Sequence, residues 1–195
     1  LIRKALFEVT NDKRGTAYHS RVLDKKSKIV GKSGTSQVRN ISTVERTLGV
    51  LENKDLPWDQ RDHALFVNYA PYDDPKIAVS VVVEHGGSGS TVAAPIARDI
   101  TLQAISGVMS ITGEEDGPPL KSAAAFADFI AGTHLYSGIL TALYRRRSTG
   151  LGGIVDISMQ DCVFPTLATA IGTYYVAGKQ MPRAGNRHPG TTLAP

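Results

Sequence analysis

The chain of 195 residues contains one cysteine, Cys162, so no disulfide can form within it. Nothing in its composition therefore indicates an oxidising compartment. The sequence also lacks a run of about 18 apolar residues, the length of a membrane-spanning helix, and residues 1–12 lack the apolar core of a signal peptide. We expect a cytoplasmic chain with no membrane segment. We also expect it to be cut at both ends, since Leu1 starts within a helical pattern and Pro195 lies in a loop predicted from Gly178 onward.

A concentrated basic surface is also absent. The net charge is +4, and Lys and Arg are spread over both halves apart from the run 145–147. That run stands at the end of a predicted helix, where the helix dipole favours cations. We therefore expect no nucleic-acid partner. The hydrophobic content of 42% is that of an ordinary globular protein, so the chain can form a core.

The first half of the chain has strand-like patterns between two helical ones. Residues 1–12 carry apolar side chains at helical spacing, and a second helix is expected from about Thr91. Between them, three segments rich in β-branched or aromatic residues predict strands: 28–40, 63–69 and 77–83. The turn-forming residues 71–75 join the last two into an antiparallel hairpin. The polar residues 41–61 predict a long loop.

The composition changes near the middle of the chain, which predicts two domains, 1–100 and 101–195. The second half is rich in alanine and helical in pattern. Residues 122–147 and 159–177 predict helices, and residues 154–158 predict one short strand between them. We expect an α+β fold, with three antiparallel strands and flanking helices in the N-terminal part and a mainly helical C-terminal part.

A short motif, Lys32-Ser33-Gly34-Thr35-Ser36, stands inside the first predicted strand. Lysine supplies a fixed positive charge, and the hydroxyls of Ser33 and Thr35 can donate hydrogen bonds to a carboxylate or carbonyl. Gly34 allows an extended substrate to lie close along the strand. A triplet of this kind is one of three elements of a serine acyl-transfer site. The alternative is an ordinary strand that follows a glycine turn.

The sequence on both sides of this motif resembles class B penicillin-binding proteins of the cell-elongation type. The similar segments are, in order, Asn11-Asp12 with Gly15 to Tyr18, Ile29 to Arg39, Leu56-Pro57-Trp58, Asp62 to Val67, Ile77 to Gly87 and Ala94 to Asp99. The resemblance covers about residues 1–100 and implies the last three strands of a peptidoglycan transpeptidase domain. It also implies that the parent protein is anchored in the inner membrane and acts in the periplasm.

That resemblance implies peptidoglycan stem peptides or β-lactams as ligands of the strand motif. It also implies a serine nucleophile in a Ser-x-x-Lys motif, but no serine of the chain has lysine three residues on. The assisting Ser-x-Asn element is not recognisable either. Lys32, Ser33, Gly34 and Thr35 are therefore candidate substrate-binding residues without a nucleophile.

Asp128 lies among small apolar residues, Ala123 to Gly132, in a predicted helix. A carboxylate in such surroundings is costly unless it is paired or used. Partial desolvation would also raise its nucleophilicity toward a thioester. From spacing alone, a helix-capping or hydrogen-bonded aspartate and a catalytic one both stay open.

The motifs around Asp128 resemble class III acyl-CoA transferases, the formyl-CoA-transferase-like family. The similar segments are Ser106 to Gly113, Asp116 to Pro119, Gly138 to Leu143, Thr149-Gly150 and Val155 to Asp161. The resemblance covers about residues 101–195. It implies that Asp128 attacks an acyl-CoA, that CoA then passes to a carboxylic acid, and that the protein forms a homodimer. It implies a coenzyme A thioester as substrate and no permanently bound cofactor.

Three other features have simple structural explanations. His63 and His85 stand at the ends of predicted strands without a partner at metal-ligand spacing, so we expect structural roles and no metal site. The run 86–89 is rich in glycine but lacks the lysine and the spacing of a phosphate loop, which predicts a flexible connector. Cys162 lies in an apolar helical run, which favours a buried side chain over a nucleophile.

Taken together, these features predict a fusion of two incomplete enzyme fragments that has neither activity. Two alternatives stay open. One is a residual acyl-CoA transferase that uses Asp128, and the other is a non-catalytic module that binds stem peptides or β-lactams through Lys32 and Thr35. The sequence leaves open whether the chain is an enzyme, although both resemblances are to transferases.

Overall fold

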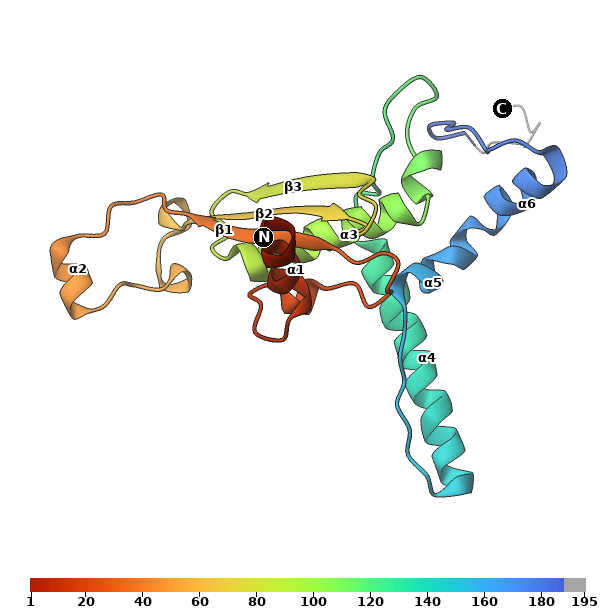
Figure 1. Cartoon of the computed structure of the whole chain (residues 1–195), viewed down its shortest axis with the longest axis horizontal. Coiled ribbons are helices and arrows are strands. Elements are labelled where there is room, and N and C mark those ends of the chain that lie inside the picture. Colours follow the sequence, from red (N-terminus) through yellow and green to blue (C-terminus); the bar gives the residue numbers. More distant parts are fainter. Residues whose placement is uncertain (188–195) are drawn as a thin grey trace. The chain divides into compact units, whose positions relative to one another are not determined.

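The structure, a computed structural model, describes residues 1–187 (Figure 1). It divides into two compact units, Leu1–Thr101 and Leu102–Pro195, and the division falls inside helix α3 (Ala94–Ile105). The predicted domain boundary after residue 100 stays a prediction. The fold is α+β, as predicted, with helices in both units and one three-stranded antiparallel sheet. Among residues 1–187, no helix is both long and apolar enough to cross a bilayer.

The first unit follows the element order expected from its sequence. Its elements are α1 (Ile2–Asn11), β1 (Val30–Ser36), α2 (Thr43–Leu48), β2 (His63–Ala70), β3 (Ile77–Val83) and the larger part of α3. The predicted helix over residues 1–12 and the three predicted strands are confirmed. A π-helical turn, Gly89–Ala93, leads into α3. The segment 41–61, predicted as a loop, contains the short helix α2.

Helix α2 is stabilised by side chains that accept hydrogen bonds from backbone N–H groups at its N-terminal end. The Ser42 hydroxyl accepts a bond from the backbone N–H of Glu45, and the Glu45 carboxylate accepts one from the backbone N–H of Ser42. Arg39 adds a charge-assisted bond of 2.7 Å to the same carboxylate. The bond from the Ser42 backbone, and next the bond from Arg39, hold the pKa of Glu45 below its ordinary value. A helix this short depends on such contacts rather than on propensity, so its sequence pattern alone is weak.

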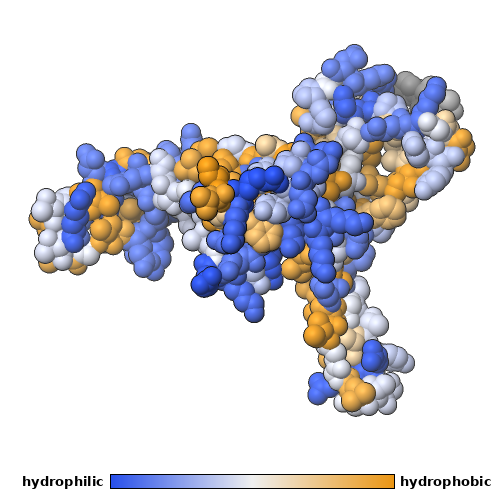
Figure 2. All heavy atoms as spheres, in the orientation of Figure 1, coloured by the Kyte–Doolittle hydropathy of each residue, from blue (hydrophilic) through white to orange (hydrophobic). Residues whose placement is uncertain are grey.

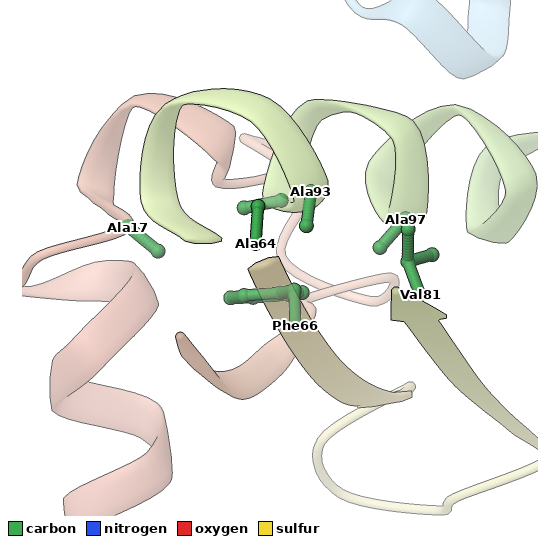
Figure 3. Packing of buried hydrophobic residues seen from close by; sticks show 7 residues of the cluster. Ala17, Ala64, Phe66, Val81, Ala93 and Ala97 are labelled. Atoms are coloured by element: carbon green, nitrogen blue, oxygen red, sulfur yellow. The ribbon is translucent and has the colours of Figure 1, made fainter. Parts of the chain in front are cut away.

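The sheet has the order β1-β2-β3, and one of its faces is covered by helices. The register sets Ser33 opposite Phe66 and Phe66 opposite Val81, so these three residues form a row on one face. Figure 3 shows Ala93, at the end of the π-helical turn, and Ala97, in the first part of α3, pointing toward Phe66 and Val81. The small alanine side chains let the helix approach the sheet closely, and Phe66 is only 1% exposed.

The opposite face of the sheet is open at its centre. Val67 and Val82 lie there and are 49% and 59% exposed. Lys32 lies directly opposite Val67 in the register and shares this face. The alternation of buried and exposed residues along β2 therefore separates one dry face from one open face.

The second unit is helical in its described part. It contains α4 (Phe126–Thr149), α5 (Met159–Val163) and α6 (Ala168–Ala177). The predicted helix over residues 122–147 is confirmed, although it starts at Phe126. The predicted helix over 159–177 is interrupted by a 3-10 turn that carries Pro165, because proline cannot donate the backbone hydrogen bond of a helix interior.

The short strand predicted over residues 154–158 is wrong, since no strand forms between residues 102 and 187. Val155 instead lies against α4 at Gly138, where an added side-chain carbon would come within 2.8 Å of Val155 Cγ1. A strand needs a neighbouring strand to satisfy its backbone N–H and C=O groups. The segment lies against α4, Ile154 is 98% exposed, and no strand is present beside it in the described part of the second unit, so an apolar, β-branched sequence stays irregular.

A small core holds the helices of the second unit together. Its buried members are Val108, Ala127, Val163 and Leu167. Cys162 is 6% exposed, which confirms the expected burial, and this burial, followed by the nearby Asp161 charge, raises the pKa of its thiol. The loop predicted from Gly178 onward is confirmed as far as Arg187, and residues 188–195 lie outside the described part.

Much of the apolar surface of α4 lies outside that core. The side chains on this helix that are at least 40% exposed include Phe129, Leu135, Tyr136, Ile139, Leu140, Leu143 and Tyr144. Figure 2 shows apolar residues at the surface along α4. A helix with apolar residues all round is typical of a position inside a larger protein.

Candidate functional site

The strand motif is divided between the two faces of the sheet. Lys32 and Gly34 share the open face, opposite Val67 and Leu65, whereas Ser33 and Thr35 share the covered face. Lys32 and Thr35 are exposed, and Ser33 and Gly34 are half-buried. The Lys32 ammonium donates a hydrogen bond to the carbonyl of Ser33. The positive charge is thus held along the strand, where an extended ligand could meet it.

The hydroxyl of Ser33 lies 2.9 Å from the Thr16 hydroxyl, in the loop after α1. Further contacts from α1 hold the beginning of β1. Thr10 and Asn11 each donate a hydrogen bond of 2.9 Å to the Ile29 carbonyl. Thr10 is fully buried, although nothing in its helical pattern marks it as important. These bonds explain why the strand starts where it does.

Glycines shape the strand motif in two different ways. At Gly31, an added side-chain carbon would come within 2.8 Å of the Phe66 ring, so packing inside the unit requires glycine there. At Gly34, the same carbon would meet only Leu65 Cβ, at 3.5 Å, which is an ordinary contact. The unit therefore does not need glycine at position 34 for its own packing, and the missing side chain leaves the strand surface open.

The glycine-rich run 86–89 forms a packed turn rather than a loose connection. The backbone N–H of Gly87 donates a 2.8 Å hydrogen bond to the Asp62 carbonyl. Gly89 is buried, and a side chain there would collide with the backbones of Gly34 and Leu65. The glycines are needed for close approach to the strand motif, so the expected flexible connector is wrong at Gly89.

A cavity of about 200 Å³ lies at the end of the strand motif. Its lining residues are Thr35, Gln37, Arg39, Ile41, Val50, Leu51, Leu56 and Asp62. Arg39 is bonded to Glu45 at 2.7 Å, and Asp62 accepts a bond of 3.1 Å from Asn53. Most of these residues belong to the segment 41–61 or flank it, and a polar loop sequence gave no signal for them.

His63 and His85 lie together beside Trp58. The two imidazole rings are 4.7 Å apart between centroids, and the Trp58 ring is 4.4 Å from that of His85. The backbone N–H of His85 donates to Nδ1 of His63 at 2.9 Å, and Nδ1 of His85 donates to the Arg61 carbonyl at 2.8 Å. Both Nδ1 atoms are therefore engaged in hydrogen bonds to the backbone. Within residues 1–187, no cluster of three or more His, Cys, Asp or Glu side chains could hold a metal ion.

Asp128 stands in the first turn of α4, where the helix dipole favours a negative charge. Its side chain is half-buried and borders a shallow depression of about 450 Å³, together with Phe129, Gly132, Thr133 and Tyr136. Phe129 and Tyr136 are mostly exposed. The carboxylate is thus accessible from a largely apolar hollow. It belongs to the second unit, whereas the strand motif belongs to the first.

Two protein families account for this pair of sites. Residues 1–102 match the penicillin binding protein transpeptidase domain, and residues 73–195 match CoA-transferase family III. The chain therefore belongs to both families, as a chimera of the two. The matches share residues 73–102, which contain β3 and the first part of α3.

Curated relatives of both kinds support these matches. The acetyl-CoA:oxalate CoA-transferase of Acetobacter aceti is 40% identical over 94 residues, which are 48% of this chain and 24% of that protein. The peptidoglycan D,D-transpeptidase MrdA of Haemophilus influenzae is 38% identical over 98 residues, which are 50% of this chain and 14% of that protein. A solved CAIB/BAIF family protein from Brucella suis is 37% identical, with a TM-score of 0.45, over 49% of this chain and 25% of its own. The chain spans a quarter or less of the length of these relatives.

Proposed function

We propose that these 195 residues carry out neither parent reaction. For the transpeptidase reaction, the observation that carries this proposal is the missing Ser-x-x-Lys pair in a chain that retains the strand motif. For the CoA-transferase reaction, it is that the match covers only 24% of the Acetobacter aceti enzyme. A serine becomes a nucleophile only when a base lies within hydrogen-bond reach of it. Ser33, the serine inside the motif, has its hydroxyl against Thr16, and the Lys32 ammonium is bonded to a backbone carbonyl. Neither contact supplies a base to the Ser33 hydroxyl, which supports the proposal.

Covalent labelling by a fluorescent penicillin tests the first part of the proposal. The H. influenzae transpeptidase serves as the positive control, and we expect no stable acyl-enzyme on this chain. A covalent adduct on any serine, located by mass spectrometry after proteolysis, would overturn the assignment.

A second candidate function is non-catalytic binding of a stem peptide or a β-lactam. It is favoured by the exposure of Lys32 and by the position of Thr35 at the 200 Å³ cavity. The test is calorimetric titration with a stem peptide that ends in a free carboxylate. We expect Lys32→Ala to abolish binding and Lys25→Ala, which removes the same charge from an exposed position, to leave it unchanged. Equal binding by both variants would refute this function.

A third candidate is a residual acyl-CoA transferase, favoured by the apolar hollow beside Asp128. By the family mechanism, the Asp128 carboxylate attacks the thioester carbonyl and releases CoA thiolate, which leaves a mixed anhydride. The thiolate then attacks the aspartyl carbonyl, so that the acyl group departs as a carboxylate and an aspartyl-CoA thioester forms. A second carboxylic acid would take up the CoA.

Hydroxylamine traps either acylated form of the aspartate as a hydroxamate, which peptide mass spectrometry detects. A residual transferase requires acyl-CoA-dependent modification that Asp128→Asn abolishes and Asp156→Asn, at an exposed site of the same unit, preserves. We expect no modification above the Asp128→Asn background. Acyl-CoA, a carboxylic acid and a second copy of the chain are the partners of this candidate, and a cytoplasmic location stays a prediction.

A further inference from the structure

Strand β3 lies at the edge of the sheet, and no strand among residues 1–187 pairs with its outer side. Such an edge is a template for another strand, and proteins commonly protect it with charges, prolines or bulges. The seven residues Ile77–Val83 include none of these, and their pairing with β2 runs unbroken over the whole strand. By contrast, β1 carries Lys32 and two glycines. The outer edge of β3 is therefore the unprotected one.

The sequence of this edge is complementary to itself. Consider an antiparallel pair with a second copy whose two-fold axis passes through Ser80. Ile77 then lies opposite the partner's Val83, and Val79 lies opposite the partner's Val81. These residues are the buried or half-buried ones of β3, so the covered faces of the two sheets become continuous. The two Ser80 residues face each other on the open side, where a hydroxyl pair is favourable.

The charged residues that flank β3 match in the same alignment. Lys76 and Glu84 are both exposed, and the Ser80 axis sets each Lys76 opposite the partner's Glu84. In the single chain, Lys76 pairs with Asp74 at 2.8 Å in an exposed contact of little stabilising effect. An axis through Val79 would instead set Glu84 opposite the partner's Asp74, with like charges together. Charge therefore selects the Ser80 axis among neighbouring registers.

We propose that the chain forms a two-fold symmetric homodimer through β3, in which the two sheets join into one continuous sheet. This interface lies in the first unit and depends on neither parent activity. It is distinct from the homodimer implied by the CoA-transferase resemblance. The self-matching edge favours a second copy as the partner, because a second copy supplies the opposite charge at both ends of β3.

Disulfide trapping tests the axis directly. In a Cys162→Ala background, Ser80→Cys supplies the only thiol of the chain, and the symmetric pair sets the two thiols within bonding reach. We expect a covalent dimer under mild oxidation. The matched control is Lys76→Cys, also exposed, whose two thiols would lie about 26 Å apart in this register. Equal cross-linking by the two variants, or none by Ser80→Cys, would overturn the proposal.

Charge exchange tests the register without introducing a thiol. Lys76→Glu and Glu84→Lys each create two like-charged cross-strand pairs, so we expect each to raise the dimer dissociation constant about tenfold. The double variant restores opposite charges and should return to the wild-type constant. Sedimentation equilibrium of the full chain measures these values, and far-UV circular dichroism checks that each variant is folded. A wild-type chain that stays monomeric throughout, or a double variant weaker than either single one, would refute the β3 dimer.

Discussion

The two units use apolar residues in opposite ways. In the first, strand alternation places Phe66 and Val81 on one face, which α1 and α3 cover. In the second, α4 carries apolar residues around its circumference, and Leu143 and Tyr144 are 52% and 81% exposed. The apolar face of a sheet can be buried by helices that are close to it in sequence. A helix with apolar residues around its circumference needs further elements of a larger fold to bury them. The difference indicates that the first unit buries more of its own apolar surface than the second unit does.

Removal of the central side chain of the first unit should have the largest effect. Phe66→Ala leaves a cavity under α3, and we expect it to destabilise the first unit by about 3–5 kcal/mol. The matched change in the second unit, Leu143→Ala at an exposed position, should stay within about 0.5 kcal/mol. Urea unfolding measures both, with Trp58 fluorescence following the first unit and far-UV circular dichroism following the helices of the second. Comparable losses would mean that α4 is buried in solution.

Alanine at two glycines should shift stability in opposite directions. Gly89→Ala forces a side chain into the backbones of Gly34 and Leu65, and we expect a loss of about 1–3 kcal/mol. Gly172, inside α6, has open space around it, so Gly172→Ala should stabilise that helix by up to about 1 kcal/mol. Thermal unfolding of both variants provides the comparison. A neutral Gly89→Ala would show that the turn can move away from the strand motif.

A buried hydrogen bond in the first unit should matter more than an exposed one in the second. Thr10→Val removes the bond to the Ile29 carbonyl, which still accepts one from Asn11, so we expect a loss of about 0.5–1.5 kcal/mol. Thr141→Val removes a bond to the Ser137 carbonyl on the exposed surface of α4 and should have almost no effect. Denaturation midpoints measure both. Equal effects would contradict the contrast between the units.

The smallest expected effect is a pH dependence confined to α2. The bond from the Ser42 backbone, followed by the bond from Arg39, lowers the folded-state pKa of Glu45 below its unfolded value. The stabilisation is therefore complete above the unfolded pKa and is lost as the pH falls through the folded one. The protection of the α2 amides, meaning their exchange rate relative to the intrinsic rate at each pH, should decrease with acidification over that window in the wild type. Glu45→Gln should show no such dependence, and identical profiles would contradict the capping arrangement.

Much of the first unit was predictable because strand alternation is a local signal. The strands over 63–69 and 77–83, their hairpin and the helix over 1–12 all appear in the structure. The strand predicted over 154–158 failed because its β-branched residues carried the same local signal without a neighbouring strand. A local pattern indicates which secondary structure a segment favours. A strand also needs a neighbouring strand to pair with, and that neighbour comes from elsewhere in the fold.

For the candidate sites, too, the sequence supplied one part of the description and the folded structure supplied the other. Residue type and motif were enough to select the candidate residues, and their roles stay predictions: Lys32, Ser33, Gly34, Thr35 and Asp128. Their surroundings were not predictable. The contact of Ser33 with Thr16 spans 17 residues, and the 200 Å³ cavity uses a segment with no periodic signal. Contacts of this kind depend on chain folding, which spacing along the sequence does not encode.

The sequence by itself determined the two family memberships, the absence of a Ser-x-x-Lys pair and the elements of the sheet, because all of these depend on residue identity and local order. The tertiary structure decided which strand face is dry, why Gly89 must be glycine while Gly34 need not be, and which edge of the sheet is left without a partner. The physical reason is that burial, close approach and strand pairing are relations between distant segments. They exist only once the chain has folded.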